Sequence, residues 1–274
     1  MSAYTTISPD KLSRLLGSPK GPILIDVRPE ADFAADPRLI PGSVRRDAGA
    51  IALWGPALAG TATIVIGQQG TTFSLGVAAW LRHWGVRAET LEGGFAAWAA
   101  AGLPLVPQDK LPPRDAQGRT VWVTRARPKV DRIACPWLIR RFVDPNAVFL
   151  FVPPSEVPGV AEAFQAAPFD VEGVFWSHRG SNCAFDAMVE ELGLKTEPLL
   201  RLAAIVRGAD TARLDLVPEA AGLLAASLGL SRLYADDLEQ LDAGLALYDA
   251  FYRWCRDAVD ESHAAHAATP GKRK

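Results

Sequence analysis

The chain has 274 residues, of which 49% are hydrophobic and 22% charged, and its formal net charge at pH 7 is −2. This balance is that of a globular protein and argues against a surface that is basic throughout, as a dedicated DNA-binding protein would have. The length accommodates two domains, no apolar run approaches the ~20 residues that cross a bilayer, and no secretory signal opens the chain, so we expect a cytoplasmic protein without a membrane partner.

The first hundred residues alternate short apolar runs with helical patterns. Ser8 and Pro9 begin a predicted helix that ends at Leu16, since serine is a good N-cap and proline suits the first helical turn. The runs at 23–27, 63–66 and 90–92 are typical of buried strands, and helices are expected at 74–84 and 95–101. Strands separated by helices of this length predict an α/β fold with a parallel sheet covered on both faces.

One loop of this segment lies where a reactive group is expected. Residues 67–73, with the sequence GQQGTTF, connect the strand at 63–66 to the following helix. A loop so placed commonly holds a nucleophile or an anion, yet this one contains no cysteine, histidine or charged side chain. All three cysteines lie in the second half of the chain, and their odd number and irregular spacing do not suggest a disulfide framework.

Residues 107–119 are rich in proline and charge, and we expect an extended linker there between a first domain at 1–106 and a second at 120–260. The second domain is expected to be mainly α-helical with a few short strands. Its strands are predicted at 120–123 and 149–152, and its helices at 185–192, 197–206, 218–228 and 235–258. Residues 261–274, which include His263 and His266, are expected to form a flexible tail.

The last predicted helix has apolar residues at alternating four- and three-residue steps, as in an a/d seam. The seam comprises Tyr234, Leu238, Leu241, Leu245, Tyr248, Tyr252 and Cys255. We expect this face to pack inside its own domain, and a homodimer through residues 234–255 is the alternative.

The second domain opens with a basic stretch followed by a cysteine. Four basic residues lie between Arg125 and Arg132, which suits either a solvated surface or an oxyanion patch. Two placements of Cys135 remain open. A helix that begins at Pro136 would make Cys135 its N-cap and favour the thiolate, whereas burial would make the thiol inert.

The segment 177–186, SHRGSNCAFD, combines more reactive residue types than any other. His178 and Cys183 are of the kind that bind zinc or iron, but two ligands do not make a site. Carboxylates distant in sequence would have to complete it. Asp210 and Asp215 are the first candidates, and Asp236, Asp237 and Glu239 are further ones.

The first domain resembles the rhodanese family. The motifs that carry the resemblance are Asp26-Val27-Arg28, Ile40-Pro41-Gly42-Ser43, and a closing pattern formed by Leu91, Gly93, Gly94, Trp98, Gly102 and Pro104. The resemblance implies that a persulfide-forming cysteine would begin the loop after the central strand. Here its place falls on Gln68, or on Gly67 if the loop is one residue longer. We therefore expect an inactive sulfurtransferase, whose loop retains at most an anion-binding backbone.

Residues 121–256 resemble the C-terminal domain of the chromate-resistance protein B family, in blocks that include DRIACPWLIRRF, SHRGSNCAFDA and LAAIVRGADTARLDL. The resemblance implies a bacterial response to chromate, and for some members a transcriptional regulator. The family pattern places an acidic residue where this chain has Phe175.

Together these features predict a chromate-stress protein that binds a metal ion, zinc or iron, or a small oxyanion, without sulfurtransferase turnover. The alternatives are a DNA-binding regulator and an enzyme, which would be either a residual sulfurtransferase or a redox enzyme that acts on chromate through Cys135 or Cys183. The predicted metal ligands are His178, Cys183 and Asp210, with Asp186, Asp237 and Cys135 in reserve, and the predicted anion-facing cations are Arg125, Arg127, Arg140 and Arg207.

Overall fold

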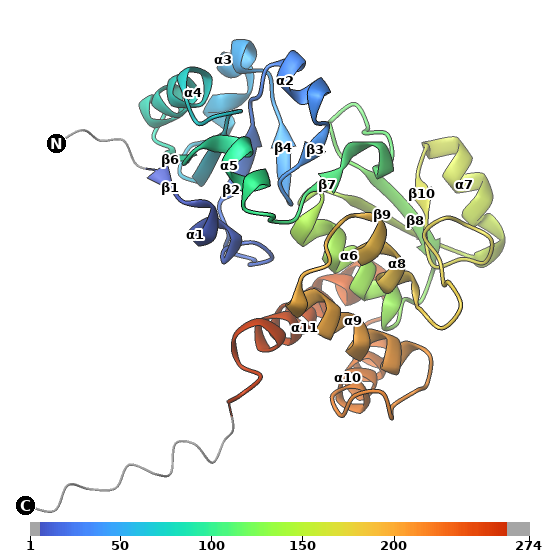
Figure 1. Ribbon diagram of the computed structural model, residues 1–274. Helices are drawn as coiled ribbons and strands as arrows, with labels where there is room; N and C mark the ends of the chain where they lie inside the picture. Colours follow the sequence, from blue (N-terminus) through green and yellow to red (C-terminus); the bar gives the residue numbers. More distant parts are fainter. Residues whose placement is uncertain (1–5, 262–274) are drawn as a thin grey trace, which may run out of the picture.

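The computed structural model describes residues 6–261. These form two domains, each with a parallel sheet and helices, and the second domain ends in a group of helices (Figure 1). The expected tail histidines lie outside the described residues. In the first domain, five strands form a parallel sheet in the order β1-β6-β5-β2-β4. These strands are β1 (Thr6–Ile7), β2 (Ile23–Asp26), β4 (Ser43–Arg45), β5 (Ala62–Ile66) and β6 (Arg87–Leu91).

Helices cover both faces of this sheet, as predicted. Strand side chains alternate between the faces, so that Leu24 and Ile64 enter one core and Ile25 and Val65 enter the other. The first core also receives α1 (Pro9–Ser13) and α5 (Gly94–Ala100), and the second receives α3 (Ile51–Trp54) and α4 (Thr72–His83). The helix α2 (Glu30–Ala35) and the short strand β3 (Arg38–Leu39) were not predicted.

The Asp-Val-Arg motif has a structural role in this domain. Asp26 and Arg28 form a buried ion pair at 2.7 Å, and the Arg28 guanidinium lies 3.7 Å from the centre of the Phe95 ring. The same guanidinium donates to the carbonyl groups of Asp36 and Arg38. A buried charge needs this full set of partners, so the motif ties the strand β2 to the segment that follows α2.

The segment expected to be a linker is attached to both domains. The strand β7 (Val106–Pro107) pairs antiparallel with β3, and Lys110 forms a 3.0 Å salt bridge with Glu191 of the second domain. An isolated antiparallel β-bridge joins Arg114 to Thr120. This proline-rich stretch therefore lies along the surface of the protein and does not cross open solvent.

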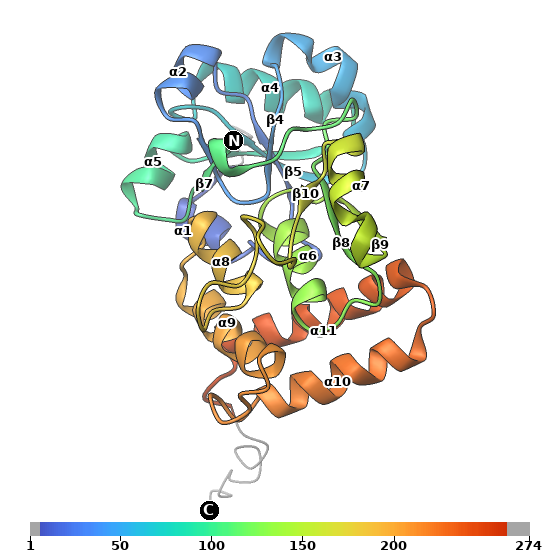
Figure 2. The ribbon, with the colours of Figure 1, turned by 90° about the vertical axis from the view of Figure 1, so that its right-hand side faces the viewer.

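The second domain contains a three-stranded parallel sheet in the order β10-β8-β9. Its strands are β8 (Val121–Arg125), β9 (Val148–Val152) and the two-residue β10 (Ala167–Pro168). Four of its helices form the lower part of the molecule (Figure 2). They are α8 (Ala184–Glu191), α9 (Glu197–Asp210), α10 (Ala220–Leu233) and α11 (Asp237–Asp257).

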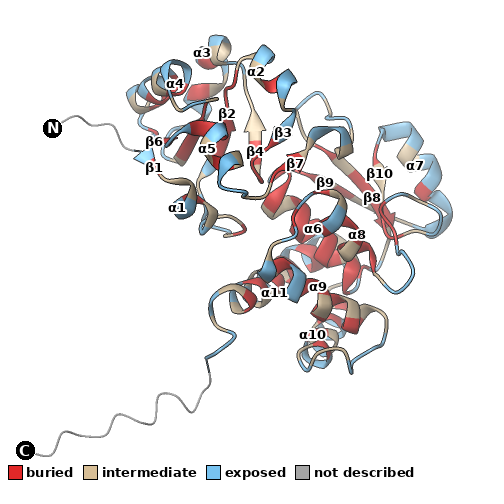
Figure 3. Cartoon of the chain, in the orientation of Figure 1, coloured by how far each residue is buried: buried red, intermediate tan, exposed pale blue. Residues whose placement is uncertain are grey.

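Helix α6 (Asp131–Phe142) is the centre of the second core, while α7 (Val157–Phe164), which was not predicted, packs beside β8 and β10. Nine of the twelve residues of α6 are buried, which is why it appears mostly red among its neighbours (Figure 3). The seam on α11 packs against this core through Leu241, Leu245, Tyr248, Tyr252 and Cys255. The seam therefore packs inside its own domain, as expected, although Leu238 at its beginning is half exposed. Among the described residues, no helix is long and apolar enough to span a membrane.

Candidate functional site

The loop after β5 lies at the position of a rhodanese active site but presents no thiol. It borders a hollow of about 320 Å³ whose wall includes Gly67, Gln68 and the first residues of α4. The carbonyl groups of Gly67 and Gln68 accept hydrogen bonds from α5, and Gly94 allows this close approach. A Cβ atom on Gly94 would lie 2.3 Å from the Gly67 carbonyl oxygen.

The reactive side chains of the molecule gather instead in the second domain, around His178. Its Nε2 atom lies 3.2 Å from Oδ1 of Asp170, 3.3 Å from Oδ2 of Asp210 and 3.6 Å from Oδ2 of Asp131. A single ring nitrogen can donate only one hydrogen bond, so it cannot satisfy three carboxylates. The ligand atoms of Asp131, Asp170 and His178 lie within 4.8 Å of one another. Asp210 is not a member of this group, although its carboxylate contacts the same nitrogen of His178.

Parallel strands bring two of these carboxylates to one edge of the small sheet. Asp131 follows β8 through a short loop, and Asp170 follows β10 after a single residue. Because β8 and β10 are neighbours and parallel, their carboxyl ends meet at the same edge. His178 lies in the next loop, just before a tight turn in which Arg179 and Asn182 exchange backbone hydrogen bonds, and Asp210 ends α9.

Asp131 is held in place more firmly than the other members. Its side chain is fully buried and accepts the backbone N–H groups of Ala184 and Phe185 at 2.8 and 3.0 Å, at the start of α8. The preceding residue, Val130, has a strained φ of 32°, and its carbonyl accepts a 2.7 Å hydrogen bond from the Tyr248 hydroxyl of α11. Three helices therefore fix the direction of this carboxylate.

Asp170 connects the cluster to two arginines. Its Oδ2 atom lies 3.0 Å from Arg125 and 3.2 Å from Arg132, while Oδ1 is directed to His178. The Nε atom of Arg125 is buried without a hydrogen-bond partner among the described residues. The cluster thus contains three carboxyl groups and two guanidinium groups, so it lacks one positive charge when all three carboxyl groups are ionised and the imidazole of His178 is neutral.

Burial, and the mutual repulsion of the carboxylates, oppose that ionisation. Burial is the largest cause that raises the pKa of Asp131, and the charges of Asp210 and Asp170 raise it further. The pKa of Asp210 is raised too, first by burial and then by Asp170. Such a group of acids binds either protons or a cation.

The structure brings together two of the predicted metal ligands, His178 and Asp210, and leaves the others in different contacts. Cys183 caps α8 and its thiol lies 3.3 Å from Asp186, which in turn pairs with Arg207 at 2.7 Å. Asp237 accepts the backbone N–H of Arg127 at 3.0 Å. None of Cys183, Asp186 and Asp237 belongs to the group of mutually close ligand atoms found among residues 6–261.

Cys135 lies inside α6, which corrects one of its two expected placements. The helix begins at Asp131 and not at Pro136, so Cys135 is not its N-cap. The thiol is fully buried and donates to Asp131, and burial followed by the negative charge of Asp131 raises its pKa well above the ordinary value. The burial that the other alternative requires is confirmed.

Of the four arginines expected to face an anion, Arg125 alone contacts the carboxylates around His178. Arg127 donates to carbonyl groups at the end of α10, Arg140 pairs with Asp242, and Arg207 pairs with Asp186. Phe175 is half exposed and packs edge-on against Trp176.

Sequence reasoning missed Asp131 and Asp170, and it identified Arg132 only as part of the basic stretch that begins at Arg125. Asp131 stands at the start of a recognisable block, and its place after a strand was a usable signal. Asp170 carried no such signal, because β10 has only two residues and is too short to show the alternation of apolar and polar residues that predicts a strand.

Comparisons with known proteins agree with this two-domain organisation. Residues 8–101 match the family described as the rhodanese-like domain, and residues 122–255 match the ChrB C-terminal domain. Protein ChrB of Cupriavidus metallidurans is 34% identical over 155 residues, which cover 55% of this chain and 46% of that protein, so the chain matches about half the length of this relative.

Solved structures resemble the first domain. A rhodanese-related protein from Thermoplasma volcanium is 22% identical, covers 38% of this chain and is itself covered to 98%, with a TM-score of 0.33. A thiosulfate sulfurtransferase from Pseudomonas aeruginosa is 26% identical over 39% of this chain and 20% of its own, with a TM-score of 0.34. The chain consists of a rhodanese-like domain followed by a ChrB C-terminal domain.

Proposed function

We propose that the second domain binds a divalent metal ion through Asp131, Asp170 and His178, with Asp210 as a further ligand. The convergence of three carboxyl groups on the Nε2 atom of one histidine is the observation that supports this most directly. A cation would supply the positive charge that the two guanidinium groups do not provide. It would also displace the protons that the buried carboxyl groups hold in its absence.

The donor atoms suit a first-row transition metal. Carboxylate oxygens with one imidazole nitrogen are ligands for zinc, iron(II) and manganese, whereas a thiolate set would have favoured softer ions. Asp131 already accepts two backbone N–H groups, so it enters such a site in a fixed orientation, as metal ligands with outer hydrogen bonds do.

We further propose that the bound ion and the neighbouring arginines together bind a small tetrahedral oxyanion, and that chromate is the physiological one. Guanidinium groups match oxyanions in charge and geometry, and Arg125 has a buried Nε–H with no partner among the described residues. The relation to ChrB proteins is the ground for choosing chromate. The first domain then acts without sulfur transfer, because Gln68 or Gly67 stands where a nucleophile would be needed.

Elemental analysis of the untagged protein tests the metal site. We expect the wild type to contain about one equivalent of a transition metal per chain. His178→Ala should lose most of this metal. His83→Ala is the matched control, because His83 is also exposed but lies at the end of α4 in the first domain. Equal metal content in wild type and His178→Ala, or no metal in either after titration with zinc, iron(II) and manganese, would refute the proposal.

Calorimetry with the metal-loaded protein tests the oxyanion. Chromate should bind to the wild type and at least tenfold more weakly to Arg125→Gln, while the metal content of that variant is retained. Equal chromate affinity in Arg125→Gln and the wild type would show that Arg125 does not bind the oxyanion. This result would not contradict the proposed metal site.

A further inference from the structure

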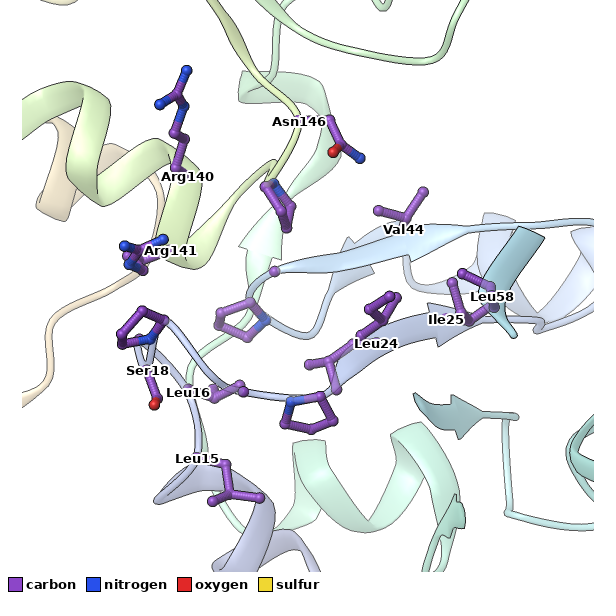
Figure 4. A pocket seen from close by; sticks show the side chains of 18 of the residues that line it. Leu15, Leu16, Ser18, Leu24, Ile25, Val44, Leu58, Arg140, Arg141 and Asn146 are labelled. Carbon is purple, nitrogen blue, oxygen red and sulfur yellow. The ribbon is translucent and has the colours of Figure 1, made fainter. Parts of the chain in front are cut away.

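A second cavity, remote from the His178 cluster, lies between the two domains. Its volume is about 460 Å³ (Figure 4). The first domain contributes the beginnings of β2 and β4, and the second contributes the end of α6 and the segment after it. Since the sheet is parallel, this is the edge opposite the loop after β5, so the cavity is separate from the rhodanese loop as well.

Most of the wall is apolar and belongs to the first domain. Leu24, Val44, Trp54 and Leu58 are among its lining residues. Leu15 and Ile23, which also line it, remain 40% and 36% exposed. Apolar side chains that stay open to solvent in a concave site favour an apolar ligand, because the ligand removes their surface from water.

The rest of the wall includes three arginines. Arg46, Arg140 and Arg141 line the cavity, and no aspartate or glutamate among residues 6–261 does. Arg141 is neutralised by Asp249, which accepts hydrogen bonds from two of its nitrogens at 2.8 Å. Arg140 contacts Asp242 at 3.1 Å, a side chain that is 74% exposed, and its guanidinium lies 5.2 Å from the centre of the Phe149 ring. Arg46 forms no salt bridge within residues 6–261.

We propose that this cavity binds an amphipathic organic anion, with one carboxylate or sulfonate head group on an apolar body. The head group lies near Arg46 of the first domain, and the body lies on the apolar wall around Leu24 and Leu58 and reaches Pro145 of the second domain. Such a ligand contacts both domains at once. It therefore stabilises their present arrangement by binding, independently of any metal.

Fluorescence titration with 8-anilinonaphthalene-1-sulfonate, an apolar sulfonate, tests the site in the full-length protein. We expect one saturable site that octanoate displaces and octanol does not. Arg46→Gln should weaken binding at least fivefold. Arg253→Gln is the matched control, since this exposed arginine of α11 pairs with Asp257 and does not line the cavity.

Ala57→Trp provides a steric test. Ala57 is exposed and lines the cavity, so an indole there fills the space without entering the core, and binding should fall at least tenfold while the melting temperature is kept. The proposal is overturned if binding is not saturable, or if Ala57→Trp binds as the wild type does. Displacement by octanol as effective as that by octanoate would overturn the selectivity for an anion.

Discussion

Replacement of Asp170 by asparagine should abolish tight metal binding while the domain stays folded. Asp170 has a φ of 49°, a left-handed conformation that asparagine adopts readily, so the turn after β10 is kept. Asparagine also keeps the size of the side chain and one of its oxygens. The substitution therefore removes one charge from the centre of the cluster and little else.

In the metal-free protein the effects of this lost charge largely offset each other. The ion pairs of Asp170 with the partly exposed Arg125 and Arg132 contribute about 0–1 kcal/mol each. Against this, Asp170 repels Asp131, and two like charges about 4–5 Å apart cost ~3–4 kcal/mol at an effective dielectric constant near 20, before protonation relieves most of it. We expect the free energy of unfolding to change by no more than about 1–2 kcal/mol.

In the presence of metal the two proteins should differ clearly. Loss of a carboxylate ligand should weaken binding about 100-fold or more, since even outer partners of ligands cost roughly 10–100-fold. An ion at 100 times the wild-type Kd stabilises the wild type by about 2.7 kcal/mol, but a protein that binds 100-fold more weakly gains only about 0.4 kcal/mol. For a chain of this size these values correspond to increases in melting temperature of about 5–11 °C and ~1 °C.

The assay is thermal unfolding of chelator-treated protein, with and without zinc or manganese at a fixed concentration. Asp215→Asn serves as the control, because Asp215 is an exposed carboxylate of the same domain whose nearest cation is 3.8 Å away. Equal increases in the wild type and Asp170→Asn would refute the assignment of Asp170 as a ligand. A variant that is unfolded without metal would refute the balance of charges described above.

Three further outcomes are expected. The full-length protein should form no thiocyanate from thiosulfate and cyanide above the uncatalysed rate, because Gln68 cannot form a persulfide, and measurable turnover would contradict this. Gly94→Ala should lower the free energy of urea unfolding of the first domain by roughly 2–4 kcal/mol, since its Cβ would meet backbone atoms at 2.3 and 2.5 Å; Gly102→Ala, with a similar φ but no atom within 4 Å, isolates the smaller cost of the conformation, and equal effects would show that the contact is unimportant. Burial raises the pKa of Cys255 from 9.0 to about 11, so the folded state keeps a proton that the unfolded state loses. The stability that this thiol contributes is complete below pH 9 and is lost between about pH 9 and 11. Across that range the free energy of unfolding should therefore fall less steeply with pH in Cys255→Ala than in the wild type. Parallel slopes in the two proteins would place the thiol in contact with solvent.

Local pattern was sufficient to predict the parallel sheet of the first domain and helices on both of its faces, but not α2 or β3. Buried strands such as β2 and β5 are short apolar runs, and the motifs around Asp26 and Gly94 form an ion pair and a close backbone contact that require those residues. The absence of a nucleophile from residues 67–73 is also a property of sequence alone, since no fold can supply a missing thiol. In the second domain, the main helices and the burial of the α11 seam were predictable from their periodicity.

The candidate metal site depended on tertiary structure. Asp131, Asp170, His178 and Asp210 are spread over eighty positions of the chain, and they meet because β8 and β10 are parallel neighbours and α9 ends beside them. Residue type alone favoured Cys183 as a ligand, but it could not reveal that this thiol caps α8 and pairs with Asp186. Spacing in sequence reports local periodicity, whereas the direction of a side chain toward a shared site depends on strand order and helix packing.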